Sequence, residues 1–327
     1  MGRSSVIIDP VCAGHDNPEH LESNARLLNA ISGIPKDIPL RNSEPASLRD
    51  VQRVHNHQYI SRLERRCAAV TSVDWMDADT YITRHSFAAA MHAAGAAIAA
   101  VERSEDGEHC FALIRPPGHH AEYDRAMGFC LINNVAVAAK KALETVDKVA
   151  IVDWDAHHGN GTQNCFYGTD RVLYCSLHQE HIFPYSGSVL EAGAGEGKGF
   201  TINAPLPSGS KIADYSYVLS EIVAPVIGRF APDVMIISAG LDLLYDDPLG
   251  MMRIMPEDLG ILTGIIARAS GLPLALVLEG GYGKSNGDAV RHIFAALANS
   301  DDAGMPGLFS ERTRQLVSFL KKTNHLA

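Results

Sequence analysis

The chain has 327 residues, which is enough for one large α/β domain or for two smaller ones. Its formal net charge of -10 at pH 7 argues against a general nucleic-acid-binding protein, because such a protein needs a basic surface. Hydrophobic residues make up 46% of the chain, but no apolar run approaches the roughly 20 residues of a membrane-spanning helix, so we expect no membrane partner.

The six cysteines are scattered along the chain, and no two of them form a Cys-x-x-Cys pair. This distribution is typical of a reduced intracellular protein rather than of a disulfide scaffold. The first residues lack the apolar segment of a signal peptide. We therefore expect a cytoplasmic protein.

Short runs of Val, Ile and Leu alternate with alanine-rich helical patterns along the chain. In chain order, the predicted elements are a helix over residues 86–101, a strand over 110–114, a helix over 134–143, strands over 149–152 and 172–175, a helix over 214–230, a strand over 234–237, a helix over 257–269 and a strand over 274–278. The alternation predicts an open, mostly parallel α/β sheet. No linker interrupts it, so we predict a single domain over residues 1–327.

Two adjacent histidines follow the predicted strand over residues 110–114. In an open parallel sheet, ligands bind outside the carboxyl ends of the strands. The prolines of the segment Arg-Pro-Pro-Gly-His-His (115–120) forbid a helix and fix an extended loop. The loop presents His119 and His120 together, which favours a functional role over core packing.

A second cluster, Asp-Trp-Asp-Ala-His-His-Gly-Asn-Gly (153–161), follows the strand over 149–152. Residues two apart in an extended segment project to the same side, so Asp155 and His157 can converge on one point. A carboxylate and an imidazole suit zinc or another divalent first-row metal. The alternative interpretation is a helix cap followed by a turn, which so many titratable groups in a short segment disfavour.

Two further clusters follow the last two predicted strands. Asp242 stands where a third metal ligand is needed, whereas Asp246 and Asp247 are interpreted as a turn and a cap. Tyr282 lies among three glycines, and its hydroxyl could donate a hydrogen bond to a developing oxyanion. Taken alone, this pattern is equally typical of an ordinary loop tyrosine.

The four clusters together favour metal-assisted amide hydrolysis. Asp155, His157 and Asp242 give a metal three protein ligands and leave one position open, as in catalytic zinc sites. An arginase-like ureohydrolase binds two manganese ions and would need further carboxylates close to the first ligands. Here the residue two after His157 is Gly159 and the residue two after Asp242 is Leu244, so a second metal ion lacks ligands. A non-catalytic acyl sensor would be expected to have lost a proton-transfer or oxyanion residue. Because His119, His120 and Tyr282 are all present, the sequence favours an enzyme over such a sensor.

These segments closely resemble the histone deacetylase family. The matching motifs run in order through nearly the whole chain and are RPPGHHAEYDRAMGFCLINN (115–134), DWDAHHGNGTQ (153–163), SLHQ (176–179), SAGLDLLYDDPLG (238–250) and EGGYG (279–283). The resemblance implies the arginase–deacetylase fold, a three-layer α/β/α domain whose central, mostly parallel sheet has eight strands. The chain is most similar to class II and bacterial members, which include acetylpolyamine amidohydrolases.

The resemblance also implies a role for each catalytic motif residue. Asp155, His157 and Asp242 would bind one zinc ion. His120 would act first as general base and then as general acid, and Tyr282 would polarise the acyl carbonyl. The implied partners of the paired histidines are Asp153, which would keep His119 protonated, and Asn160 beside His120, where class I members have an aspartate.

Substrate and structural-ion sites are implied in the same way. Phe129 and Phe183 would line an acyl-lysine tunnel, the Gly128 carbonyl would accept the substrate amide, and Asp79 would grip the substrate backbone at the rim. A structural potassium ion would bind near Asp153, Asp155, His157, Ser176 and Leu177, and a second monovalent site would involve Phe166, Thr169 and Val172.

The substrate amine stays open at the level of the sequence. N-acetylated lysine, acetylated polyamines and other small N-acyl amines all fit the motifs. Polyamine hydrolases carry a long insertion before the paired histidines, and the short segment from Tyr59 to His119 has none, which argues against that alternative. The oligomeric state is likewise open.

Overall fold

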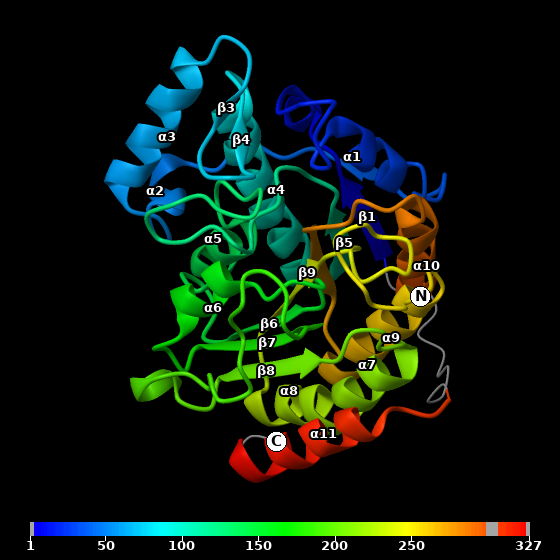
Figure 1. Ribbon diagram of the computed structural model, residues 1–327. Coiled ribbons are helices and arrows are strands. Elements are labelled where there is room, and N and C mark those ends of the chain that lie inside the picture. Colours follow the sequence, from blue (N-terminus) through cyan, green and yellow to red (C-terminus); the bar gives the residue numbers. More distant parts are fainter. Residues whose placement is uncertain (1–2, 299–306, 325–327) are drawn as a thin grey trace.

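The computed structural model describes residues 3–298 and 307–324 of the chain. Within these residues, the central element is a sheet of eight strands in which neighbouring strands pair in parallel. The strands follow the order β2–β1–β5–β10–β9–β6–β7–β8 across the sheet (Figure 1). Their bounds are β1 Arg3–Ile7, β2 Leu40–Arg41, β5 Glu108–Ala112, β6 Val149–Asp153, β7 Val172–Gln179, β8 Thr201–Leu206, β9 Val234–Ala239 and β10 Leu274–Leu278.

Helices cover both faces of the sheet and give the three α/β/α layers that the family resemblance implies (Figure 1). On one face α4 packs on β5, β10 and β9, with α5 beside it. On the other face α10 packs on β1 and against α1 and α9, and α11 lies outside α7. The helix bounds are α1 Asn24–Ile31, α2 Leu48–Val51, α3 His57–Ala69, α4 Ser86–Glu105, α5 Asn134–Ala142, α6 Asn160–Phe166, α7 Ile212–Val218, α8 Ala224–Phe230, α9 Asp258–Ser270, α10 Asn286–Ala298 and α11 Glu311–Thr323.

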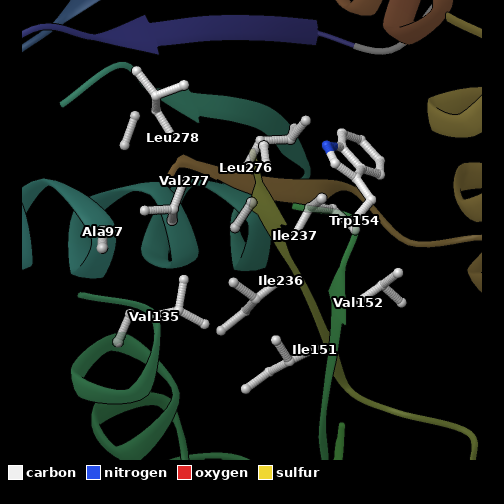
Figure 2. Close-up of a cluster of buried hydrophobic side chains, with 14 of the residues drawn as sticks. Ala97, Val135, Ile151, Val152, Trp154, Ile236, Ile237, Leu276, Val277 and Leu278 are labelled. Atoms are coloured by element: carbon white, nitrogen blue, oxygen red, sulfur yellow. The ribbon is translucent and has the colours of Figure 1, made fainter. Parts of the chain in front are cut away.

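The core lies between the sheet and its two helical layers. Figure 2 shows that Ile236 points toward Ala97 of α4 and Val135 of α5, whereas the next residue, Ile237, points to the opposite face. This alternation follows from the pleat of a strand. Both isoleucines are fully buried, and each such side chain contributes roughly 1.5–3 kcal/mol of transfer free energy. Strands buried on both faces explain the continuous apolar runs in the sequence.

The predicted elements are present, with instructive differences in their bounds. β5 starts and ends two residues earlier than predicted, because Glu108 and His109 extend its pairing with β1 even though both are polar. The predicted helix over residues 214–230 is α7 and α8 joined by a π-helical turn, Leu219–Val223. This wide turn directly precedes Pro225, which has no N–H to donate and disfavours a regular α-helix before it. The glycine-rich residues 187–199 form a loop with a short 3₁₀ turn at Gly195–Gly197.

The strand order places the motif-bearing strands side by side. β5, β10, β9, β6 and β7 are consecutive in the sheet, and all of them run in the same direction. Their carboxyl ends therefore meet at one edge, where the loops after β5, β6, β9 and β10 form the site described below. Among the described helices, none has the length and apolar composition needed to cross a membrane, and all six cysteines are free thiols.

Candidate active site

A narrow pocket of about 120 Å³ opens at the carboxyl edge of the sheet. It brings together the residues predicted from the separate motifs, because each motif follows a different strand of the same edge. Leu249, Pro117 and Gly280 also line it. The lining residues predicted from the sequence are Asp79, His119, His120, Gly128, Phe129, Asp155, His157, Phe183, Asp242 and Tyr282.

Asp155, His157 and Asp242 form a group of side chains that suits a metal ion. One ligand atom from each lies within 4.8 Å of the others. Backbone donors orient the carboxylates: Asp242 Oδ1 accepts from the N–H of Ala156 at 2.7 Å, which leaves Oδ2 2.7 Å from His157 Nδ1. Asp155 Oδ2 accepts from the N–H of Gly280 at 2.8 Å. The ligands are therefore oriented by the surrounding backbone.

The donor set of this group fits a divalent cation. Asp155 and Asp242 are almost completely buried. Burial, and then the neighbouring Asp155 carboxylate, raise the pKa of Asp242, whereas at Asp155 burial is outweighed by the neighbouring His119 and His157, which lower the pKa. Two adjacent buried carboxylates thus compete for positive charge, which a bound cation would supply. Two carboxylates and one imidazole are also the ligand types of catalytic zinc sites with an open position. The residues present thus match the predicted zinc site.

The paired histidines lie beside the metal group, each against a different polar partner. His119 Nδ1 is 3.1 Å from Asp153 Oδ2, and His120 Nδ1 is 2.8 Å from Asn160 Oδ1, which are the predicted pairings. Burial lowers the pKa of His119, but the carboxylates of Asp155 and Asp153 outweigh it and raise the pKa to about 10. Burial, and then the proximity of His119, hold the pKa of His120 well below its usual value.

Two aspartates interpreted as a local turn hold the loop that carries Tyr282. Asp247 Oδ2 accepts from the N–H groups of Tyr282 at 2.5 Å and Gly283 at 3.1 Å. Its other oxygen accepts from the N–H of Leu249 at 2.9 Å, which is the turn that the sequence predicted. Asp246 accepts from the next two N–H groups of the tyrosine loop. The turn is confirmed, but it also fixes the tyrosine backbone and the Leu249 wall of the pocket.

Two phenylalanines line the pocket from different loops. Phe129 contacts Tyr282 edge to face with ring centroids 5.6 Å apart, and Phe183 contacts His120 in the same way at 5.0 Å. Gly128 lies between these walls with a positive φ of 56°. A Cβ atom there would lie 2.6 Å from the His120 ring and 2.8 Å from the Phe183 ring, so only glycine fits.

A small hairpin forms part of the rim. Its strands are β3 (Asp74–Trp75) and β4 (Tyr81–Ile82), and the exposed Asp79 lies in the connecting loop. The hydroxyl of the next residue, Thr80, accepts from the N–H of Phe129 at 3.0 Å. The rim residue and the tunnel wall are therefore linked through one buried threonine.

The residues predicted to bind monovalent ions lie near one another in the fold. Asp153, the last residue of β6, is the register partner of Ser176 within β7, and Ser176 Oγ is 2.9 Å from His178 Nδ1. The second predicted set lies between the end of α6 and the start of β7, where the N–H of Thr169 donates to the Phe166 carbonyl at 3.2 Å and Val172 begins the strand. Potassium binding itself stays a prediction.

Three acidic residues that the motif roles did not include also organise the site. Glu279 Oε2 accepts from the N–H groups of Gly118 and His119 at 2.7 and 3.0 Å, so it holds the histidine loop. Glu122 bonds to Asn160, and Asp247 holds the tyrosine loop. Each of the three belongs to a motif quoted above, and this membership was the only signal in the sequence that it could contribute to the site. The sequence does not show the hydrogen-bond partner of each one, because that partner lies on another loop.

Comparison with known proteins identifies what this arrangement is similar to. Residues 15–297 match the histone deacetylase domain family. The chain is 38% identical over 283 residues to a probable deacetylase of Archaeoglobus fulgidus, covering 81% of this chain and 77% of that protein. It is 38% identical over 286 residues to a histone deacetylase-like amidohydrolase of Pseudomonas aeruginosa, covering 84% and 74%. The crystal structure of the HDA15 HD domain superposes with a TM-score of 0.90 at 31% identity, covering 99% of this chain and 96% of that one.

Proposed function

The chain belongs to the histone deacetylase family and is an amidohydrolase of that family, and we propose that it uses zinc to hydrolyse the amide of N-acetylated lysine or related N-acyl amines. The observation that carries this proposal is the pocket itself. In it, the metal-binding group, His120 and Tyr282 line one small pocket together with Phe129 and Phe183.

Asp155, His157 and Asp242 would hold the ion. When bound, zinc supplies a Lewis acid that polarises the acyl oxygen and increases the acidity of water. The family relationship and the three-ligand set support one catalytic ion over the two manganese ions of a ureohydrolase. The presence of both histidines and of Tyr282 likewise supports a working enzyme over a non-catalytic acyl sensor.

His120 would accept the proton of the attacking water and later return a proton to the leaving amine. Its depressed pKa supports this role, because a neutral imidazole has a free nitrogen lone pair. His119, whose pKa is raised, would remain a hydrogen-bond donor held by Asp153. The two neighbouring histidines would thus keep different protonation states for different tasks.

Tyr282 would donate a hydrogen bond to the oxyanion that develops on the acyl carbonyl. Phe129 and Phe183 would hold the alkyl stem of the substrate amine by apolar contact. The Gly128 carbonyl would accept the substrate amide N–H, and Asp79 at the rim would accept from the substrate backbone. Two phenyl side chains on the walls of a small pocket support an unbranched alkyl amine as the leaving group.

Other parts of the proposal rest on the family resemblance or on sequence patterns alone. They are the two potassium sites, the extension of one catalytic domain over residues 1–327, and a cytoplasmic location. The ends of that domain, residues 1–2 and 325–327, and residues 299–306 lie outside the described residues.

A substrate panel tests the proposal directly. Acetyl-lysine peptides, acetylpolyamines and longer acyl-lysines would be offered to the protein with and without a zinc chelator. We expect chelator-sensitive hydrolysis that returns when zinc is added back, with acetyl-lysine peptides preferred. Preference for acetylpolyamines would establish the alternative substrate class. Absence of chelator-sensitive turnover on every member of the panel would contradict the deacetylase assignment.

A further inference from the structure

A chain of hydrogen bonds extends from His120 away from the pocket. His120 Nδ1 lies 2.8 Å from Asn160 Oδ1, and the amide nitrogen of Asn160 donates to Glu122 Oε1 at 2.6 Å. Asn164, one helical turn further along α6, donates to both oxygens of Glu122 at 2.9 and 3.1 Å. The Glu122 carboxylate therefore accepts from two amide groups, and one of these groups contacts the proposed catalytic base.

Three acceptors lie at the nitrogen end of the Asn160 amide: Glu122 Oε1 at 2.6 Å, and the His120 carbonyl and the Met127 sulfur, each at 3.4 Å. The carboxylate is the nearest of them and the only charged one, so we take it as the group that decides which way the amide faces. A side-chain amide has a donor end and an acceptor end of nearly equal size, so its environment selects the orientation. An ionised carboxylate only accepts hydrogen bonds. The NH₂ end of Asn160 must therefore face Glu122, and its oxygen must face His120.

This orientation in turn decides the tautomer of His120. Because Asn160 Oδ1 can only accept, the proton of the neutral imidazole must sit on Nδ1. Nε2 then carries the lone pair. His120 lines the pocket, where a free nitrogen is what a general base requires. A reversed amide would favour the other tautomer and would place the ring proton on the nitrogen that has to accept one.

Glu122 is itself held in place by the backbone around it. Its N–H donates to the Arg125 carbonyl at 3.0 Å, and its own carbonyl lies 2.8 Å from His55 Nδ1. His55 Nε2 accepts from the N–H of Asn133 at 2.9 Å, so His55 Nδ1 carries the proton and donates to Glu122. The carboxylate is thus presented to Asn160 from a fixed loop.

From this geometry we propose that Glu122 is a positioning residue for catalysis, the third member of a His120–Asn160–Glu122 relay that fixes the proton of His120 on Nδ1. The inference rests on the proposed role of His120 as general base. It assigns to Glu122 the negative charge that class I relatives are implied to place directly beside this histidine. In this chain the charge is on Glu122, and the amide of Asn160, which lies between Glu122 and His120, transmits its effect to the histidine.

The first test reads the tautomer without measuring turnover. The protein would be labelled with ¹⁵N-histidine, and the His120 signals would be assigned by their loss in His120→Ala. We expect wild-type His120 to show the Nδ1–H tautomer, and Glu122→Gln to show a mixture of tautomers, because a glutamine amide can donate as well as accept. An unchanged tautomer in Glu122→Gln would overturn the proposal.

The second test uses kinetics on the zinc-loaded enzyme. We expect Glu122→Gln to lower kcat about 10- to 100-fold with little change in KM, since an incorrect tautomer impairs proton transfer. Asp124→Asn is the matched control, because it removes the same charge from an exposed position of the same loop, and it should leave kcat unchanged. Equal effects of the two substitutions would show that only the charge of the loop matters and would overturn the relay.

A third variant tests whether the charge can be moved. In Glu122→Gln/Asn160→Asp, the carboxylate introduced at position 160 would accept directly from His120 Nδ1, and the amide introduced at position 122 would donate to it. We expect kcat to recover to within about threefold of wild type and the Nδ1–H tautomer to return. Failure of both to recover in a folded, zinc-loaded protein would contradict the relay. Full activity of His120→Ala would instead contradict the role of His120 as general base, on which the relay rests, and would leave the deacetylase assignment to the substrate panel.

Discussion

The two sides of the pocket are built in different ways. On the histidine side, the Glu279 carboxylate also holds backbone N–H groups, but the ring of each histidine has a side-chain partner on the loop after β6, namely Asp153 for His119 and Asn160 for His120. On the tyrosine side, the loops after β9 and β10 meet through carboxylates that accept from backbone N–H groups. Asp247 holds the Tyr282 backbone in this way.

The difference corresponds to what each side must control. A histidine has two ring nitrogens, so its function depends on which one carries the proton, and at His119 and His120 a side-chain partner of Nδ1 selects that. A tyrosine has one hydroxyl with one proton, so its function depends on where the loop places it. We therefore expect isosteric changes to be severe at the partners of the histidines, and changes in backbone anchoring to be decisive on the tyrosine side.

The largest effect is expected for His120→Ala, which removes the centre of the histidine side. Without the positioned proton acceptor, kcat/KM should fall by roughly 10²- to 10⁴-fold. Steady-state kinetics with an acetyl-lysine peptide would measure the loss. Zinc content should be unchanged, because His120 is not one of the three predicted ligands. Turnover close to that of wild type would remove His120 from its assigned role.

On the tyrosine side, Tyr282→Phe removes only the hydroxyl. We expect turnover to fall by roughly 10²-fold or more, as for other oxyanion donors. KM should change little, since the ring that packs against Phe129 remains. The measurement is kcat on the same peptide, and an unchanged kcat would be incompatible with the oxyanion role.

A smaller effect is expected for Asp247→Asn, which loosens the anchor of the tyrosine loop while leaving Tyr282 in place. A misplaced donor should lower kcat by about tenfold. The same substitution in the Tyr282→Phe background should have no further effect on kcat, because Asp247 would act through the hydroxyl. Asp246→Asn is the matched control, since it contacts the next two N–H groups of the loop, and its effect should stay within about threefold. Additive losses in the double variant would show that the two sides are not built as described.

Much of the fold was predictable because its strands are buried on both faces. The apolar runs over residues 149–152 and 274–278 became β6 and β10 with almost the same bounds. The prediction failed where polarity and burial separate: Glu108 is polar, but it is buried and pairs with β1. The short strand β2 pairs with β1 over only two residues and has too few residues for a periodic pattern.

The site was predictable as far as its residues lie within one loop or match a family motif. Asp155 and His157 converge because they are two residues apart, whereas Asp242 and Tyr282 stood out because each follows a predicted strand, and the family resemblance then implied their roles. Contacts between loops were not predictable in this way. Nothing in the spacing of Asp247 indicates that its carboxylate binds the Tyr282 backbone, because that contact depends on β9 and β10 being neighbours in the sheet.

The sequence by itself determined that this chain forms a parallel α/β domain of the histone deacetylase family, with a metal-binding group at the carboxyl edge of its sheet. Burial of apolar strands and the donor chemistry of Asp155, His157 and Asp242 are properties of the residues themselves. Only the tertiary structure decided how the reactive groups are oriented. The amide of Asn160 has two ends that the sequence cannot distinguish, and the neighbouring Glu122 selects one of them because a carboxylate can only accept.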